Sequence, residues 1–377
     1  MQTFAIVIPS LNQSHFLPWA LESLRSQSRP FNLAIMDGGS TDNFKEAIRG
    51  YADIITYLRS GPDRGQASAI RKGKETIRGD IVAWLNADDY YFPEALEKVA
   101  SCFEDDPELD VVYGDAVHVT PEGFFSSYFP PIQTYNSRTL TRRCFICQPA
   151  CFVRRAAYEK VGGIDPTLRY TMDWDLWCRL SVSDAKFQYI HEPLAAVRYY
   201  AGTKTLSSDP LRYREIWRIE RKYGRRAFPV SWPGFYRFDL LFKKERTPFE
   251  GLALRALDMI RNMKRHVFAP RSPEDEMSLP IYGFDRFEEV VYRQCTIHLP
   301  WYDRRAWERL YLKVSPLDRR CRVMVNKKAY RAKVSEKEWL VVRLPQVRGP
   351  HITIIIEQSE VASPWKLKGF AVHIEGQ

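Results

Sequence analysis

The amino-acid sequence predicts an α/β fold with a largely parallel sheet for its first part, residues 1–210. Short apolar runs alternate there with helix-like segments, which is the pattern of strand–helix–strand units. Polar clusters follow several of the apolar runs. Because ligands bind open α/β sheets at the carboxyl ends of the strands, we expect a ligand site along one edge of this sheet.

The expected strands are short apolar runs that end in turn residues. They lie at 4–8, 33–36, 54–58, 81–85 and 111–115. Helix-like patterns run over 17–27, from Gly65 to Ile77, and from Pro93 to Phe103. Proline suits the first turn of a helix because its missing N–H is not needed there. This alternation predicts one α/β domain over residues 1–210.

The rest of the chain changes character twice. Residues 211–280 are helix-like, basic and aromatic, and 252–268 could form one of the helices. Residues 281–377 carry short strand-like runs between turn residues, which predicts a β-sandwich. A chain of 377 residues, 45% of them hydrophobic, can support more than one packed core.

The cysteines and the apolar runs indicate the compartment. No apolar run approaches the length of a membrane span, and the chain starts without the pattern of a signal peptide. Seven scattered cysteines suit a reducing cytoplasm better than a disulfide framework. Cys144, Cys147 and Cys151 suggest a metal site, but a fourth ligand at finger-like spacing is missing. We expect a cytoplasmic protein.

The net charge of +10 is concentrated in one segment. Residues 212–271 hold 16 Lys and Arg against 6 Asp and Glu, an excess equal to that of the whole chain. Cations beside aromatic rings suit an acidic membrane surface, which would place the protein peripherally on the inner face of the cell membrane. A helical segment packed against the first domain explains the composition equally well. Nucleic acid is disfavoured, because no nucleic-acid-binding motif accompanies the charge.

Two acidic clusters follow expected strands. Asp88-Asp89 comes after 81–85, where two carboxylates could hold a divalent cation that bridges phosphates or could belong to a solvated turn. Asp37 opens a glycine-containing stretch that ends at Asp42. That stretch could let a nucleotide approach the backbone, or it could be a tight loop with a helix cap.

Two further motifs stand at expected helix starts. Asp63-Arg64-Gly65-Gln66 places a glycine beside a cation and an amide, which suits a diphosphate but lacks the spacing of a P-loop. Asp173 begins a helix in which Leu176, Trp177 and Leu180 form an apolar face. Its carboxylate could act as a general base, or it could only complement the helix dipole.

The order and spacing of these motifs resemble the inverting family 2 glycosyltransferases. The resemblance covers residues 3 to about 206 and implies a GT-A (Rossmann-like) catalytic domain. The matching stretches are Val7-Ile8-Pro9-Ser10-Leu11-Asn12, Asp37-Gly38-Gly39-Ser40-Thr41-Asp42, Asp63-Arg64-Gly65-Gln66, Asn86-Ala87-Asp88-Asp89, Gln148-Pro149-Ala150-Cys151-Phe152, Gly162-Gly163-Ile164-Asp165 and Asp173-Trp174-Asp175-Leu176-Trp177.

The resemblance also implies roles for single residues. Asp88 and Asp89 would hold a divalent cation, Mn²⁺ or Mg²⁺, and Asp173 would be the catalytic base. The acceptor side would include Gln148, Trp174 and Asp175. The nucleotide-sugar would contact Pro9, Ser10, Asn12, Asp37, Asp63, Arg64, Gly65, Gln66, Asn86, Asp88 and Asp89.

The sequence departs from the family pattern at three places. Asn86 stands where an Asp is often the first acidic residue, and Tyr200 stands where many relatives carry a metal-contacting His. Ser68 and Arg71 replace Asp and Asn in the helix after Gly65. These departures predict looser metal binding than in the usual family pattern.

The activity implied by the resemblance is transfer of a hexosyl or N-acetylhexosaminyl group from a UDP-, GDP- or dTDP-linked donor. The acceptor would be a glycan or lipid-linked, in bacterial surface polysaccharide synthesis. The alternative is a non-catalytic glycan- or nucleotide-binding protein that keeps the GT-A fold, which Asn86 and Tyr200 favour. The β-rich region resembles accessory sandwich domains, and it could bind glycan, hold a homo-oligomer or cover the catalytic domain.

Overall fold

The computed structural model describes residues 2–121, 123, 125–129, 132–200, 202–204, 209–242, 247, 250, 252–254 and 256, together with the strands from 290 onward that are given below. Residues 4–198 contain a nine-stranded sheet. Its strand order is β3-β2-β1-β4-β8-β6-β9-β5, and β7 pairs with β6. The strands are β1 Phe4–Ser10, β2 Phe31–Asp37, β3 Tyr57–Ser60, β4 Ile81–Trp84, β5 Tyr90–Tyr91, β6 Val111–Val119, β7 Phe125–Tyr128, β8 Cys151–Arg154 and β9 Phe187–Arg198.

Strands β3, β2, β1 and β4 are parallel, and their carboxyl ends meet at one edge. Ser10 pairs with Asp37 across β1 and β2, and Asp37 pairs with Ser60 across β2 and β3. Every residue of β1 is buried, as expected of a strand in a parallel sheet covered on both faces. The register therefore gathers the polar residues that follow these strands.

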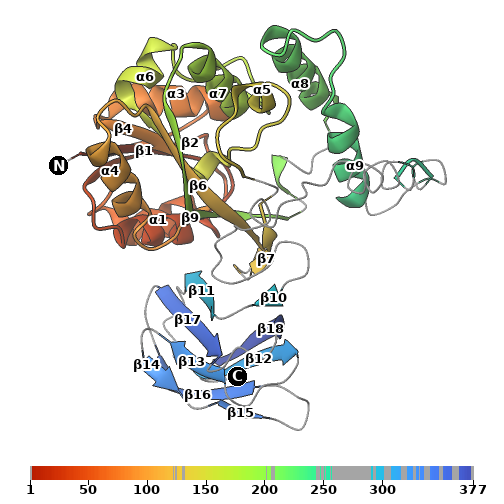
Figure 1. The fold of residues 1–377 in the computed structure, drawn as a ribbon. Coiled ribbons are helices and arrows are strands. Elements are labelled where there is room, and N and C mark those ends of the chain that lie inside the picture. The colour runs from red at the N-terminus through yellow and green to blue at the C-terminus, as the bar shows by residue number, and fades with distance from the viewer. Residues whose placement is uncertain are drawn as a thin grey trace.

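Helices cover both faces of this sheet. Figure 1 shows α3, α6 and α7 along one face and α1 and α4 along the other. On the second face, Arg29, which follows α1, forms salt bridges with Glu97 and Glu104 of α4. The helices are α1 Leu17–Arg25, α2 Phe44–Ile48, η1 Arg49–Tyr51, α3 Gln66–Thr76, α4 Ala95–Asp105, α5 Ser137–Leu140, η2 Gln148–Ala150, α6 Arg155–Lys160 and α7 Met172–Val182.

The α/β prediction is confirmed, but the sheet is mixed rather than largely parallel. Beyond β4, strands β6 and β9 are parallel to each other. Strand β8 is antiparallel to both β4 and β6, and β5 is antiparallel to β9. Antiparallel neighbours do not need the helical crossover that a parallel pair requires. The sheet is therefore mixed, and strands β5, β7, β8 and β9 were not among the expected ones.

Two element boundaries also differ from the prediction. The third strand is Tyr57–Ser60 rather than 54–58, because Ile54 and Ile55 pack against the core from the turn that precedes it. The helix after Pro93 begins at Ala95, since Glu94 adopts a positive φ of 61° at its start.

Two helices follow the sheet, α8 Pro210–Lys222 and α9 Trp232–Phe242. Arg212 of α8 forms a buried salt bridge with Asp239 of α9. Most of the predicted helix 252–268 lies outside the described residues. No helix in the described part of the chain is long and apolar enough to cross a membrane.

The described strands of the C-terminal region pair into two sheets, β10-β18-β12-β16-β15 and β11-β17-β13-β14. All their pairs are antiparallel. The β-sandwich and the domain boundaries at 210 and 280 stay predictions. The strands are β10 Val290–Val291, β11 Gln294–Pro300, β12 Trp307–Ser315, β13 Cys321–Val325, β14 Lys328–Tyr330, β15 Ala332–Val334, β16 Leu340–Val347, β17 His351–Gln358 and β18 Trp365–Ile374.

The contact between α3 and the sheet depends on Gly73. A Cβ at Gly73 would lie 2.7 and 2.9 Å from the two methyls of Val7 and 3.0 Å from Met36. We expect Gly73→Ala to lower the free energy of unfolding by about 1–3 kcal/mol, despite the roughly 1 kcal/mol that alanine gains over glycine in a helix. Urea denaturation measures the change. Gly50→Ala is the control, because a Cβ there meets nothing within 4 Å; equal stability of the two variants would contradict the expectation.

Candidate functional site

Asp37 is fully buried at the end of β2 and organises the loop that follows. Its carboxylate accepts hydrogen bonds from the hydroxyl and N–H of Ser40 and from the hydroxyl of Ser60, the last at 2.6 Å. Asn12 holds the same loop, because its Oδ1 accepts from the N–H of Thr41 at 2.9 Å. The predicted nucleotide-side cluster is thus a fixed loop, and the oxygens of Asp37 face protein donors.

The segment Asp63 to Gln66 forms the start of α3. Asp63 accepts from the N–H of Gly65 at 2.7 Å, and Gly65 has a φ of +99°, a conformation that favours glycine. Asp63, Arg64 and Gly65 are exposed, whereas Pro9 and Ser10, which end β1, are buried. A Cβ at Gly38, which follows β2, would lie 3.3 Å from the carboxylate of Asp63, so the segment before α3 lies beside the end of β2.

The side-chain amide of Asn86 joins several of the predicted residues. Its Oδ1 accepts from Gln66 at 2.7 Å, and its Nδ2 donates to Asp89 at 2.8 Å and to Gln148 at 3.1 Å. Gln148 in turn donates to the backbone oxygen of Trp84 at 2.6 Å. The structure thus brings Gln66, which we expect on the donor side, and Gln148, which we expect on the acceptor side, to the same amide.

Asp88 and Asp89 have different environments. Asp89 is only 2% exposed and accepts from Asn86 and from the N–H of Arg198, the latter at 3.1 Å. Burial raises the pKa of Asp88, and burial together with the charge of Asp88 raises the pKa of Asp89 well above its ordinary value. Asp88 is partly exposed, so it is the carboxylate of this pair that can meet a ligand.

The guanidinium of Arg198 lies buried behind these carboxylates. Its Nη1 donates to the backbone oxygen of Asp88 at 2.9 Å. Its centre lies 4.7 Å from the ring of Phe16 and 4.5 Å from that of Trp19, distances typical of cation–π contacts. This cation holds the Asp88-Asp89 turn against α1.

The hydroxyl of Tyr200 donates to the carboxylate of Asp88 at 3.0 Å and accepts from Gln13 at 3.3 Å. Tyr200 is the residue that departs from the histidine of many relatives, and the structure places it at the predicted metal ligand. A hydroxyl in this position donates a hydrogen bond where an imidazole nitrogen would offer a lone pair.

Asp173 stands in the first turn of α7 and is partly exposed. Its carboxylate accepts from the N–H of Trp174 at 2.8 Å, and burial raises its pKa to about 6. Burial and the charges of Asp89 and Asp173 all raise the pKa of the Cys147 thiol. The two carboxylates therefore lie near the same buried residue, which precedes Gln148.

Trp174 and Asp175, which the resemblance places on the acceptor side, are buried and occupied by protein partners. The indole N–H of Trp174 donates to Leu140 at 2.6 Å. Asp175 forms a salt bridge with Arg179 at 2.7 Å and accepts from Tyr223 at 2.8 Å. Both residues hold α7 in place, and of the three only Asp173 is partly exposed.

Glu215 of α8 supports the segment just before Asp173. It is 5% exposed, and its carboxylate accepts from the backbone N–H groups of Arg169, Tyr170 and Thr171 at 2.8 to 3.0 Å. Three N–H donors satisfy this buried charge. Helix α8 therefore fixes the start of α7.

The residues present fit a divalent cation that takes most of its ligands from a diphosphate. Among the described residues, no group of three His, Cys, Asp or Glu side chains is arranged to hold a metal. Cations that bind with substrate phosphates commonly need only one or two protein carboxylates, and Asp88 can supply one. Cys144, Cys147 and Cys151 are free thiols.

Sequence reasoning missed Arg198, Lys204 and Glu215. Lys204 Nζ donates to Gln66 at 2.6 Å, so it lies at the N-terminus of α3. Each of these residues contacts a partner more than forty positions away, and no local pattern marks such a pairing.

Comparison with known proteins agrees with the motifs. Residues 5–162 match the family model described as Glycosyl transferase family 2. An uncharacterized glycosyltransferase of Haemophilus influenzae is 29% identical over 213 residues, 54% of this chain and 71% of that protein. A PGL/p-HBAD biosynthesis glycosyltransferase of Mycobacterium tuberculosis is 29% identical over 212 residues, 55% of this chain and 80% of the relative.

Solved structures are more distant. Staphylococcus aureus TarS 1–349 in complex with UDP-GlcNAc has a TM-score of 0.45 and 16% identity, over 71% of this chain and 76% of that one. The mannosyltransferase PcManGT from Pyrobaculum calidifontis, in complex with GDP-Man and Mn²⁺, has a TM-score of 0.42 and 16% identity, over 72% and 77%. Residues 5–162 of this chain are thus similar to the family 2 glycosyltransferases, and both relatives are named as glycosyltransferases.

Proposed function

We propose that this chain is an inverting glycosyltransferase that moves a sugar from a nucleoside diphosphate to a glycan or lipid-linked acceptor. The observation that carries the proposal is the position of Asp173, a partly exposed carboxylate with a pKa raised to about 6. Its charge and that of Asp89 both raise the pKa of the Cys147 thiol, and Gln148, the next residue, accepts a hydrogen bond from Asn86. Asp173 as the base and the Asn86–Asp89 element on the donor side, both near the segment Cys147–Gln148, suit the transfer of a sugar between two substrates.

The donor diphosphate would lie at the N-terminus of α3. The backbone N–H groups there favour anions, and Lys204 brings a positive charge to the same place through its hydrogen bond to Gln66. These groups would stabilise the charge that develops on the departing diphosphate. Arg64, exposed beside them, adds a second cation.

Asp88 would hold a divalent cation, Mn²⁺ or Mg²⁺, against the diphosphate. When bound, such a cation neutralises the phosphate oxygens of the leaving group. Asp89 would hold the turn at Asp88 in place from the interior. One of its oxygens accepts from the Asn86 amide, and the other accepts from the backbone N–H of Arg198. The protein contribution to the metal site would then be a single carboxylate.

Asp173 would accept the proton of the acceptor hydroxyl. The hydroxyl oxygen forms a bond to the anomeric carbon while the bond from that carbon to the diphosphate oxygen breaks, and the electron pair leaves with the diphosphate. Attack from the side opposite the leaving group inverts the anomeric configuration. A base with a pKa near the working pH is well matched to this role.

We place the transfer of a hexosyl or N-acetylhexosaminyl group in surface polysaccharide synthesis, at the inner face of the cell membrane. The relatives named for PGL/p-HBAD biosynthesis support a biosynthetic setting. Large apolar side chains are exposed in the basic segment, and this supports membrane contact. Within 211–280, the described ones are Leu211, Trp217, Phe228, Val230, Trp232, Tyr236 and Leu252.

A non-catalytic nucleotide- or glycan-binding protein is the second candidate. The hydroxyl of Tyr200 on Asp88 favours it, since this contact competes with a metal. Hydrolysis of a sugar nucleotide with Mn²⁺ but not with chelator would support the enzyme, and binding without any turnover would support the second candidate.

Replacing the base tests the mechanism. We expect Asp173→Asn to lower kcat by roughly 10²–10⁴-fold, because proton transfer contributes about that factor. Nucleotide binding should stay nearly normal, since Asp173 lies on the acceptor side, and the rise in melting temperature with UDP or GDP measures it. Near-normal turnover would remove Asp173 from this role.

The pH profile tests the same group independently. A carboxylate with its pKa raised to about 6 is protonated below that pH and cannot accept a proton. We expect kcat/KM to be level above this pH and to fall roughly tenfold per unit below it. A profile level down to pH 4.5 or so would mean that a group with an ordinary carboxyl pKa is the base.

The contact between Tyr200 and Asp88 controls metal affinity. We expect Tyr200→His to bind Mn²⁺ more tightly, because imidazole is a metal ligand and the hydroxyl on Asp88 is removed. Tyr200→Phe is the control, since it removes the hydroxyl without adding a ligand. Electron paramagnetic resonance of free Mn²⁺ measures binding without turnover, and equal affinities of the two variants would contradict the expectation.

A further inference from the structure

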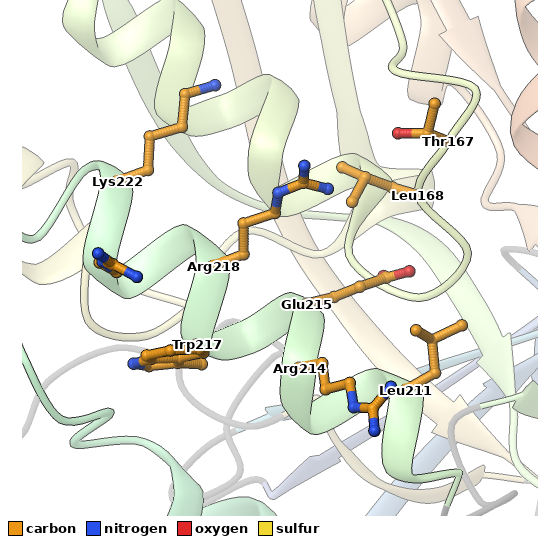
Figure 2. Close-up of a pocket in the computed structure, with 9 residues that line it drawn as sticks. Thr167, Leu168, Leu211, Arg214, Glu215, Trp217, Arg218 and Lys222 are labelled. Carbon is orange, nitrogen blue, oxygen red and sulfur yellow. The ribbon is translucent and has the colours of Figure 1, made fainter.

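Helix α8 and the loop before α7 enclose a cavity that the proposed chemistry does not use. Its volume is about 790 Å³. We name this cavity the cationic groove, and Figure 2 shows its walls. The lining residues are Thr167, Leu168, Leu211, Arg214, Glu215, Trp217, Arg218, Arg221 and Lys222.

Four of the lining side chains are cations on one side of a single helix. Arg214, Arg218 and Lys222 follow one another at intervals of four residues, and Arg221 lies three positions after Arg218, so they are neighbours on the helix surface. All four are exposed. None of them forms a salt bridge with a carboxylate in the described part of the chain. Like charges at this spacing destabilise a helix, so the arrangement calls for an anionic ligand.

The carboxylates near the groove leave its positive charge largely uncompensated. Glu215 is buried and accepts from the N–H groups of 169–171. Asp165 accepts from the N–H and hydroxyl of Thr167. Burial raises the pKa of Asp165, but those hydrogen bonds and the charges of Arg179 and Arg218 outweigh it, so the pKa is lowered. The groove therefore keeps a net positive wall on α8.

An apolar surface adjoins the cations. Leu211 is 37% and Trp217 38% exposed, and the indole N–H of Trp217 donates to Ala227 at 3.2 Å. That contact brings the loop after α8 to the groove, and Phe228, the next residue, is 83% exposed. Phosphate-binding cations beside exposed apolar side chains match a molecule with an anionic head and a lipid tail.

The groove also adjoins the proposed base. Glu215 in its wall holds the backbone of 169–171, which leads directly into Asp173. We propose that the cationic groove binds the phosphate groups of a lipid-linked acceptor, so that the acceptor hydroxyl is delivered to the start of α7. This inference rests on the proposed function in naming the ligand an acceptor; the binding of the phosphate groups does not depend on turnover.

Flotation with vesicles tests the proposal on the full chain, with no donor present. One set is phosphatidylcholine with polyprenyl diphosphate, and the other is phosphatidylcholine with phosphatidylglycerol at equal surface charge. We expect preferential binding to the first set, and competition by inorganic pyrophosphate. Equal binding to both sets would mean that the protein binds any acidic membrane surface without preference for the diphosphate, and this would overturn the proposal.

Matched charge removals locate the binding. Arg214→Gln with Arg218→Gln should weaken binding to polyprenyl diphosphate vesicles roughly tenfold or more, because charge-assisted hydrogen bonds to phosphate are lost. Arg225→Gln with Arg226→Gln removes the same charge outside the groove and should leave binding near that of the unaltered protein. Equal losses in the two pairs would overturn the groove as the site.

A second pair and a separate readout keep the outcomes distinct. Arg221→Gln with Lys222→Gln should reproduce the loss if the first pair does not fold, as checked by circular dichroism. Hydrolysis of the sugar nucleotide in water should persist in both groove pairs. If the unaltered protein hydrolyses the sugar nucleotide but shows no vesicle preference, this inference fails and the proposed function stands. If the unaltered protein shows no hydrolysis, the proposed function fails.

Discussion

The hydrogen bonds of the Asn86 side chain set the geometry of the candidate site. This amide accepts from Gln66 at the start of α3 and donates to Asp89 and Gln148. A carboxylate in its place could accept from Gln66, but it could not donate to the other two. Asn86, which departs from the family pattern, therefore links the proposed donor side to the proposed acceptor side through its hydrogen bonds.

The two aspartates that follow divide their work because their surroundings differ. Asp89 is buried and accepts a hydrogen bond from the N–H of Arg198, whereas Asp88 is partly exposed and accepts one from the hydroxyl of Tyr200. Burial and the charge of Asp88 raise the pKa of Asp89, and the hydrogen bonds from Asn86 and Arg198 act in the opposite direction. Arg198 supplies positive charge and a backbone donor at that point. In the proposed metal site, Asp88 would then be the single protein carboxylate, and the looser metal binding expected from the departures stays a prediction.

Helix α8 belongs to the basic segment and also contacts the backbone that precedes Asp173, the proposed base. Through Glu215 it fixes the backbone before Asp173, and through Arg214 and Arg218 it forms one wall of the cationic groove. One helix can thus position the base and receive the charged part of an acceptor. This gives the basic composition of residues 212–271 a local role, beyond a general attraction to membranes.

The sequence by itself determined the α/β class, the strands β1, β2 and β4 and the polar residues at their carboxyl ends, because apolar runs and turn residues are local signals. It did not determine the antiparallel β8 and β5, or the partners of Asn86, Asp89 and Asp173. Only the tertiary structure decided these, since Arg198, Lys204 and Glu215 reach them from distant parts of the chain. Asp88 and Asp89 are adjacent and chemically identical in the sequence, and their burial and their partners in the fold distinguish them.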